Sequence, residues 1–228
     1  MPTPPQGHRE SLAVVAESAA HALNNVLATL FAAESYLEDA ADGPNGKARE
    51  AIASACASAT ALSAALHLLS ISADDVPLLT AAGSETGLDV TVLHSLARWL
   101  ADNAGIACDV PAHGSIDVPF DYDSLKALLL CAGFDLRRRA GARAEVRCTI
   151  RQSAPHRNDQ AQLGFDFSAP GSGNAAPGQR QSRHPCSIAL DHAAAVLPPA
   201  GVSLRGAEGG SMGWHITLRT QTSQPTRP

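Results

Sequence analysis

The sequence predicts an α+β protein in which a long helical hairpin precedes an α/β sandwich, with helices layered on one mixed sheet. Three observations support this fold class. Residues 9–41 contain no glycine or proline and are dense in alanine, leucine and glutamate. A second helical pattern follows a short loop, and residues 87–220 then alternate between helical and strand patterns. A chain of 228 residues is long enough for these two units.

The hairpin is predicted from two runs of apolar residues with the spacing of a bundle seam. The first run is Leu12, Ala16, Ala19, Leu23, Val26, Leu30, Ala33 and Leu37, and the second is Ala48, Ile52, Ala55, Ala59, Leu62, Leu66 and Leu69. Between them, residues 42–46 read DGPNG, a run of strong turn formers. Because two helices cannot cover both seams, we expect residues 9–73 of two chains to form a dimeric four-helix bundle.

The second unit, residues 87–220, follows a connector at 74–87 that contains Pro77, Gly83 and Gly87. The patterns predict helices at 90–103, 121–140 and 187–197, with Asp121 as the cap of the second. They predict strands at 107–110, 115–120, 144–151, 162–168, 202–205 and 213–220. Residues 169–184 are rich in glycine, proline, serine and glutamine, which is typical of a mobile loop. We expect residues 221–228 to be a disordered tail.

Composition argues against several classes of partner. The net charge of −5 gives no global attraction to nucleic acid or to an anionic membrane. The longest apolar stretches span about 10 residues, short of the roughly 20 that cross a bilayer, so a cytoplasmic protein is expected. The five cysteines are scattered, with no CxxC motif of a zinc or redox site. We therefore expect small buried thiols in a reducing compartment.

The segment His21 to Leu27 reads HALNNVL and lies within the first predicted helix. At 100° per residue, His21 points away from the seam and shares its face with Ser18 and Asn25. A neutral imidazole on a rigid helix is a competent nucleophile towards phosphorus. A lone surface histidine also commonly has no function, so the spacing alone leaves both readings open.

The H-x-L-N-N-x-L segment in the first helix of a hairpin, followed by an α+β sandwich, resembles the bacterial two-component histidine kinases. The resemblance implies a Bergerat-type ATP-binding fold for the second unit. It also implies that His21 is the phosphoacceptor and that Asn25 assists dephosphorylation. A receiver domain would dock on the adjoining face at Ser18, Leu27 and Ala28. The family usually has an acid after the histidine, where this chain has Ala22.

The ATP-binding motifs of that family are altered in this chain. Cys131 and Asp135 stand where two asparagines belong, the second of which normally holds magnesium. The expected D-x-G-x-G reads DFSAP at residues 166–170, or SAPGS at 168–172, and the expected G-x-G-L reads CSIA at 186–189. Only the closing strand, GWHITL at 213–218, matches. We therefore expect no bound nucleotide or other cofactor and no metal in this chain.

A retained histidine with an eroded ATP site resembles the histidine phosphotransferases of the ChpT type. The resemblance implies a phosphorelay enzyme that passes a phosphoryl group between receiver aspartates through His21, with magnesium supplied by the receiver. It implies response-regulator receiver domains, and a hybrid histidine kinase, as partners. The alternative is a pseudokinase adaptor that binds receivers or a kinase without moving phosphate. Ala22 favours the adaptor, whereas His21 beside Asn25 favours the relay.

Overall fold

The computed structural model describes residues 45–71, 86–111, 115–118, 121–141, 144–153, 162–169, 184–206 and 213–219, with scattered positions between 19 and 33. Its main helices are α2 (Asn45–Ser70), α4 (Val90–Ala104), α5 (Tyr122–Ala140) and α6 (Pro185–Val196), with a 3-10 turn, η2, at Pro198–Ala200. Its strands are β1 (Thr86–Asp89), β2 (Ala107–Asp109), β3 (Ser115–Val118), β4 (Arg147–Ser153), β5 (Gln162–Ser168), β6 (Val202–Gly206) and β7 (Gly213–Arg219). The predicted α+β class is confirmed.

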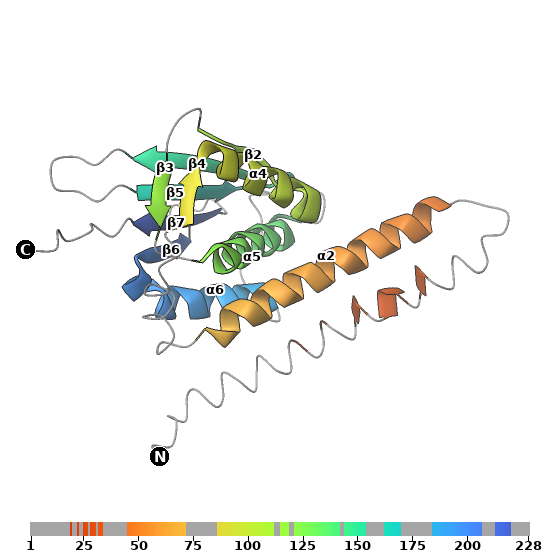
Figure 1. Cartoon of the computed structure of the whole chain (residues 1–228). Helices are drawn as coiled ribbons and strands as arrows, with labels where there is room; N and C mark the ends of the chain where they lie inside the picture. Colours follow the sequence, from red (N-terminus) through yellow and green to blue (C-terminus); the bar gives the residue numbers. More distant parts are fainter. Residues whose placement is uncertain are drawn as a thin grey trace, which may run out of the picture.

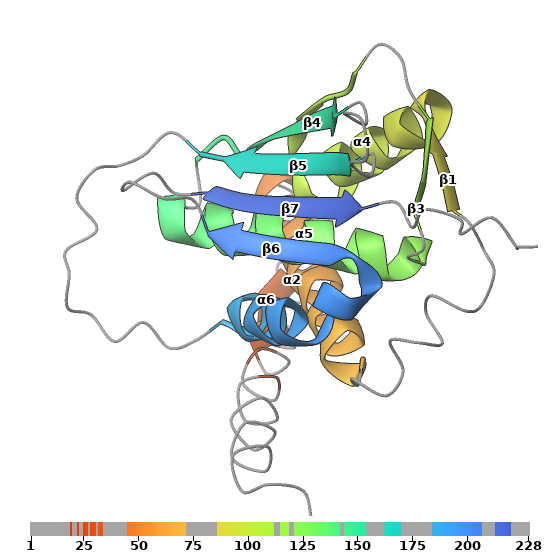
Figure 2. The ribbon, with the colours of Figure 1, turned by 90° about the vertical axis from the view of Figure 1, so that its left-hand side faces the viewer.

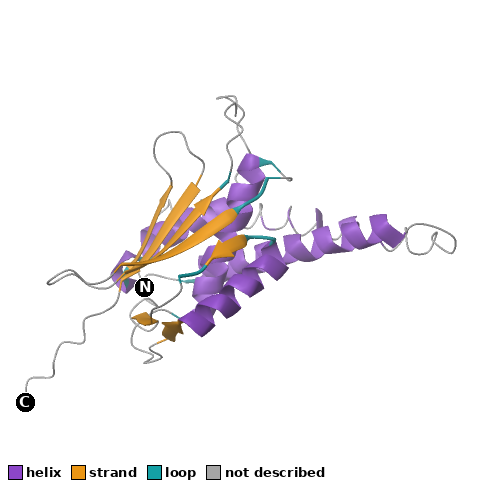
Figure 3. Ribbon diagram, turned by 90° about the horizontal axis from the view of Figure 1, so that it is seen from above, coloured by secondary structure: helices purple, strands orange, loops and turns teal. Residues whose placement is uncertain are grey.

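Five strands form a mixed sheet in the order β2-β4-β5-β7-β6. Strand β2 runs parallel to β4, and the other neighbours are antiparallel. Helices α4, α5 and α6 cover one face of this sheet, as Figures 1 and 2 show. Helix α2 lies on the far side of α5 and α6 from the sheet, so that the view from above in Figure 3 shows successive layers.

Strands β1 and β3 form a separate antiparallel pair, which corrects two expectations. The sequence predicts a single sheet that includes residues 115–120, and it places residues 86 and 87 in a connector. Strand β1 reads TGLD, a composition with weak strand preference. Its conformation depends on pairing with β3, a tertiary contact that no local pattern reveals.

Each helix on the sheet begins at a residue that caps it. The Asp89 carboxylate accepts a hydrogen bond from the Val92 backbone at 2.8 Å, and the Asp121 carboxylate accepts one from the Ser124 backbone at 2.9 Å. The predicted cap at Asp121 is therefore confirmed. Helix α6 begins two residues before the predicted start, because His184 caps it and Pro185 suits the first helical position.

Helix α2 packs its apolar stripe against α5 and α6 of the same chain. The buried side chains that join the common core are Ala61, Ala64, Ala65 and Leu68. Of the predicted seam, Ala48, Ala55 and Leu62 are buried within this chain, whereas Ala59 is exposed and Leu66 is 47% exposed. The cover expected for these two positions is a second chain, and that dimer stays a prediction. The residues that pack on α5 and α6 form a further apolar stripe of α2, beside the predicted seam, because these helices supply an additional apolar surface.

Two histidines form hydrogen bonds that join α2, or the residue after it, to its neighbours. The His67 Nε2 atom lies 2.9 Å from the Ser124 hydroxyl of α5. The His192 Nε2 atom of α6 donates to the Ile71 carbonyl at 2.8 Å, just beyond the end of α2. By length and composition alone, the stretch Glu50–Ser70 of α2 is long and apolar enough to cross a membrane. About a third of that stretch is buried within the described structure.

Replacing Leu68 by alanine should lower the free energy of unfolding by about 2 to 5 kcal/mol, because its fully buried side chain would leave a cavity. The matched control is Ser63→Ala, at an exposed position of the same helix outside the predicted seam, which should change stability by less than about 0.5 kcal/mol. Urea unfolding followed by circular dichroism measures both. Equal losses for the two variants would show that α2 does not pack as described.

Candidate functional site

The candidate phosphotransfer residues belong to the first predicted helix, of which the structure describes only part. The described positions between 19 and 33 are all helical. His21, Ser18 and Leu27 lie outside the described residues, so their assigned roles stay predictions. Asn25 and Ala28 are described, and both are exposed.

The burial pattern of this helix agrees only in part with the predicted seam. Val26 and Ala33 are 6% and 1% exposed, whereas Leu30, another predicted seam residue, is 41% exposed. The Thr29 hydroxyl donates to the Asn25 backbone carbonyl at 2.8 Å, a hydrogen bond within the helix. Ala28, the described position of the face assigned to partner docking, and Asn25 beside it are therefore both open to solvent in this chain.

The second candidate region is the joint between α5, α6 and β7, where the family resemblance places magnesium and the phosphates. Asp135 of α5 is completely buried there. Its Oδ2 atom accepts a hydrogen bond from Trp214 Nε1 at 2.8 Å and lies 2.6 Å from Arg139 Nη2. Its Oδ1 atom accepts a short hydrogen bond from the Ser187 hydroxyl. We call these four residues the Asp135 cluster.

The Asp135 cluster neutralises a buried charge with groups of the protein itself. Both carboxylate oxygens are engaged, and the Arg139 guanidinium also lies 5.4 Å from the centroid of the Trp214 ring. A cation that bound Asp135 would have to displace Arg139 or a hydrogen-bond donor, which leaves a buried polar group unpaired. Across the described residues, no group of three or more His, Cys, Asp or Glu side chains is placed to hold a metal.

Asp166, the first residue of the altered D-x-G-x-G segment, points to the other side of the sheet. Phe165 and Phe167 are buried on the helix side, so the alternation along β5 turns Asp166 towards solvent. There its two carboxylate oxygens contact His215 Nδ1 at 2.6 Å and Arg151 Nε at 3.1 Å. Ser168 is the first residue of the alternative alignment at 168–172. It lies on the same face of β5 as Asp166 and is exposed. In neither alignment of the motif does the first polar side chain lie beside α5 and α6.

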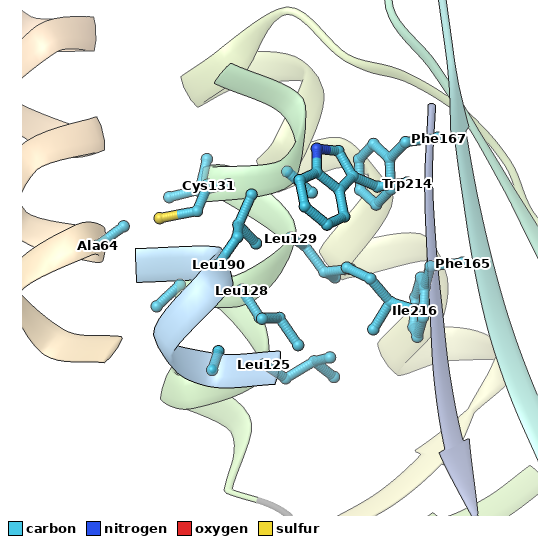
Figure 4. Packing of buried hydrophobic residues seen from close by; sticks show 14 of the residues in the cluster. Ala64, Leu125, Leu128, Leu129, Cys131, Phe165, Phe167, Leu190, Trp214 and Ile216 are labelled. Atoms are coloured by element: carbon cyan, nitrogen blue, oxygen red, sulfur yellow. The ribbon is translucent and has the colours of Figure 1, made fainter. Parts of the chain in front are cut away.

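Apolar side chains occupy the helix side of β5 and β7. Figure 4 shows Phe167 and Trp214 beside one another, with Leu129 and Leu190 facing them from the helices. Gly133 of α5 is closely covered, because an added Cβ atom would lie 2.1 Å from Ile106 Cδ1. This glycine therefore serves close packing between α5 and Ile106. The region around the Asp135 cluster is a packed core.

Sequence reasoning missed the contacts of both aspartates for different reasons. The orientation of Asp166 could have been read from the alternation of Leu163, Phe165 and Phe167 along one strand. The Asp135 cluster combines residues from α5, α6 and β7, and only the neighbouring pair Asp135 and Arg139 has a helical spacing that signals contact.

Comparisons with known proteins give likeness of structure only. No family model matches the sequence, and no curated protein matches it. A bacterial phosphotransferase is similar in structure, with a TM-score of 0.46 and 12% identity over 95% of this chain and 98% of its own. The Acinetobacter baumannii histidine kinase AdeS has a TM-score of 0.45 and 12% identity, covering 89% of this chain and 98% of its own.

A third similar structure is the histidine kinase domain of the Erythrobacter litoralis EL346 blue-light activated histidine kinase. Its TM-score is 0.38 at 15% identity, with 96% of each chain covered. Likeness at this level says nothing about activity, so the functional argument depends on the residues of this chain.

Replacing Asp135 by alanine should destabilise the fold by about 3 to 5 kcal/mol, because it leaves the buried Trp214 N–H and Ser187 hydroxyl without their acceptor. Asp123→Ala is the matched control on the same helix. Asp123 is exposed, and its 3.5 Å contact with Lys126 should contribute at most about 1 kcal/mol. Thermal unfolding compares the two variants, and an Asp135→Ala protein as stable as the control would contradict the Asp135 cluster.

Proposed function

We propose that this protein is a two-component phosphotransferase that relays a phosphoryl group between receiver aspartates through His21, without ATP-dependent autophosphorylation. The observation that carries the proposal is the Asp135 cluster. The carboxylate at the position of the metal-binding asparagine is engaged by Arg139, Ser187 and Trp214, while the helix face at Asn25 and Ala28 is open. These observations support a function in which the first helix docks a partner protein and the second unit binds no nucleotide.

Such a relay needs little from the second unit. In the forward step, a ring nitrogen of His21 attacks the phosphorus of a receiver acyl phosphate, the P–N bond forms, and the P–O bond to the aspartate breaks. The leaving carboxylate and the receiver's magnesium carry the developing charge, so the reaction depends on in-line placement. The reverse of this step on a second receiver completes the relay. Asn25 would orient a phosphoryl oxygen or a water beside the phosphohistidine.

The other proposed properties follow from the same reading. The partners would be receiver domains and a hybrid histidine kinase, and two copies of the first hairpin would associate as a homodimer. The magnesium would arrive with the receiver, and the relay would operate in the cytoplasm.

The second candidate is an adaptor that binds receivers or a kinase without moving phosphate. The observation that favours it is Ala22, which stands where the resembled kinases usually carry an acidic residue that acts as a base. In the relay this acid is dispensable, because the phosphoryl donor is a receiver rather than ATP. The two candidates therefore differ only in whether His21 is phosphorylated.

A transfer assay separates the two candidates. Incubation with radiolabelled, phosphorylated receivers should place acid-labile, base-stable phosphate on the wild-type chain and none on His21→Gln or His21→Ala. Both variants should still fold and bind the receivers, since a histidine predicted to lie on the helix surface contributes little to stability. Asn25→Ala should change the lifetime of the phosphohistidine, and Ala28→Arg should abolish docking. Unchanged phosphate signals in the His21 variants, with docking lost in Ala28→Arg, would contradict the relay and support the adaptor.

Calorimetric titration with magnesium and a non-hydrolysable ATP analogue should give no saturable heat at micromolar concentrations, because Phe167, Trp214 and the Asp135 cluster fill the helix side of the sheet. Asp135→Asn, which restores the amide of the resembled kinases, should not create binding either. Stoichiometric binding by the wild-type chain would mean that a nucleotide opens this core.

A further inference from the structure

Four cysteines that are far apart in the sequence come together as two pairs in the fold. Cys108 of β2 lies directly opposite Cys148 of β4 in the parallel register. Cys131 of α5 interacts with Cys186 at the start of α6. All four are reduced thiols. Neither pair belongs to the proposed relay site.

The register of Cys108 and Cys148 suits a disulfide. Neighbouring strands lie about 4.8 Å apart, and disulfides join Cα atoms that are roughly 4.4 to 6.8 Å apart. Cys148 is buried in the core, and Cys108 is partly buried and packs against that same core, so both side chains are on the helix side of the sheet. The two sulfurs can therefore bond without either side chain crossing to the other face of the sheet.

The two thiols of this pair differ in exposure and acidity. Cys108 is partly exposed and lies on β2, an edge of the described five-stranded sheet, whereas Cys148 is fully buried. The hydrogen bond with Cys148 lowers the pKa of Cys108, although burial and Asp109 act in the opposite direction. That hydrogen bond and burial both raise the pKa of Cys148. Cys108 is therefore the thiol of this pair that a dissolved oxidant reaches first.

The other pair is shielded from solvent. Hydrogen bonding with Cys131, together with His184, lowers the pKa of Cys186 to about 6. Cys131 and Cys186 are nonetheless both 0% exposed, so a dissolved reagent reaches them only if α5 and α6 separate. Accessibility as well as ionisation governs thiol oxidation, which makes Cys108 the first of these four to react.

We propose that Cys108 and Cys148 form a redox-active dithiol, which a hydroperoxide closes to a disulfide across β2 and β4. The Cys108 thiolate attacks the terminal peroxide oxygen, the O–O bond breaks, and the alkoxide or hydroxide that leaves takes up a proton. Cys108 becomes a sulfenic acid. The Cys148 sulfur then attacks the Cys108 sulfur and displaces water. In sum, two thiols lose two electrons and two protons, and the hydroperoxide is reduced to an alcohol, or to water, with one further water released.

The disulfide would enclose the segment from β2 to β4, which contains α5 and the Asp135–Arg139 pair. A cross-link around a long segment restricts the unfolded chain more than the folded one, so it stabilises the fold. The oxidised protein should therefore melt several degrees higher than the reduced protein. A dithiol reductant should reverse both the bond and the shift.

The test uses the full chain carrying Cys56→Ser, which removes the exposed thiol of α2. After hydrogen peroxide treatment, free thiols are blocked with N-ethylmaleimide at acid pH, and the protein is digested with trypsin. Mass spectrometry should detect peptide 99–126 joined to peptide 148–151, with the mass expected for loss of two hydrogens. Peptides 127–137 and 184–205, which carry Cys131 and Cys186, should remain unlinked and carry the label once unfolded.

Cys108→Ser in this background should abolish the linked peptide and the melting shift, whereas Cys131→Ser should leave both in place. The proposal is overturned if peptide 127–137 becomes joined to 184–205 before 99–126 joins 148–151. It is also overturned if Cys108 advances to the sulfinic acid without a bond to Cys148, or if all four thiols resist the peroxide. None of these outcomes bears on phosphate transfer through His21.

Discussion

The burial of α5 between the sheet and α2 is the constraint on which the rest of the structure depends. Most of its residues from Ser124 to Leu136 are buried, so it has apolar contacts on nearly every side. A helix in this position needs two covering surfaces. The sheet supplies one, and α2 and α6 supply the other, which explains why α2 shares the core of the second unit.

This arrangement gives the Asp135 cluster its stability and its chemical character. A carboxylate at the centre of such a layer is tolerated only when every oxygen is paired. Arg139 comes from the next turn of the same helix, Ser187 from α6 and Trp214 from β7, so the cluster ties three elements together. In the described residues these elements hold a paired carboxylate beside large aromatic rings, which supports the proposal that this unit binds no nucleotide. The proposed function accordingly depends on the exposed face of the first helix.

Some elements of this fold follow from local sequence signals, and others depend on tertiary contacts. Strand β5 has the predicted bounds, and Asp121 caps α5 as predicted, because alternation and capping are read from a few neighbouring residues. The stripe by which α2 packs on α5 and α6 was not predicted from the sequence, because a helix with many alanines and leucines can present more than one apolar stripe. The partner surface then decides which stripe is buried. Strand β1 was missed because its pairing with β3 gives it its conformation.

The sequence by itself determined the α+β class, most element positions and the HALNN segment, since composition and periodicity are properties of the chain alone. It also showed that the nucleotide motifs are altered. Only the tertiary structure decided that Asp135 is fully paired, that Asp166 faces solvent, and that the scattered cysteines lie in two pairs. The physical reason is that these contacts join elements distant in the sequence. Their partners are set by strand register and helix packing, which no local pattern encodes.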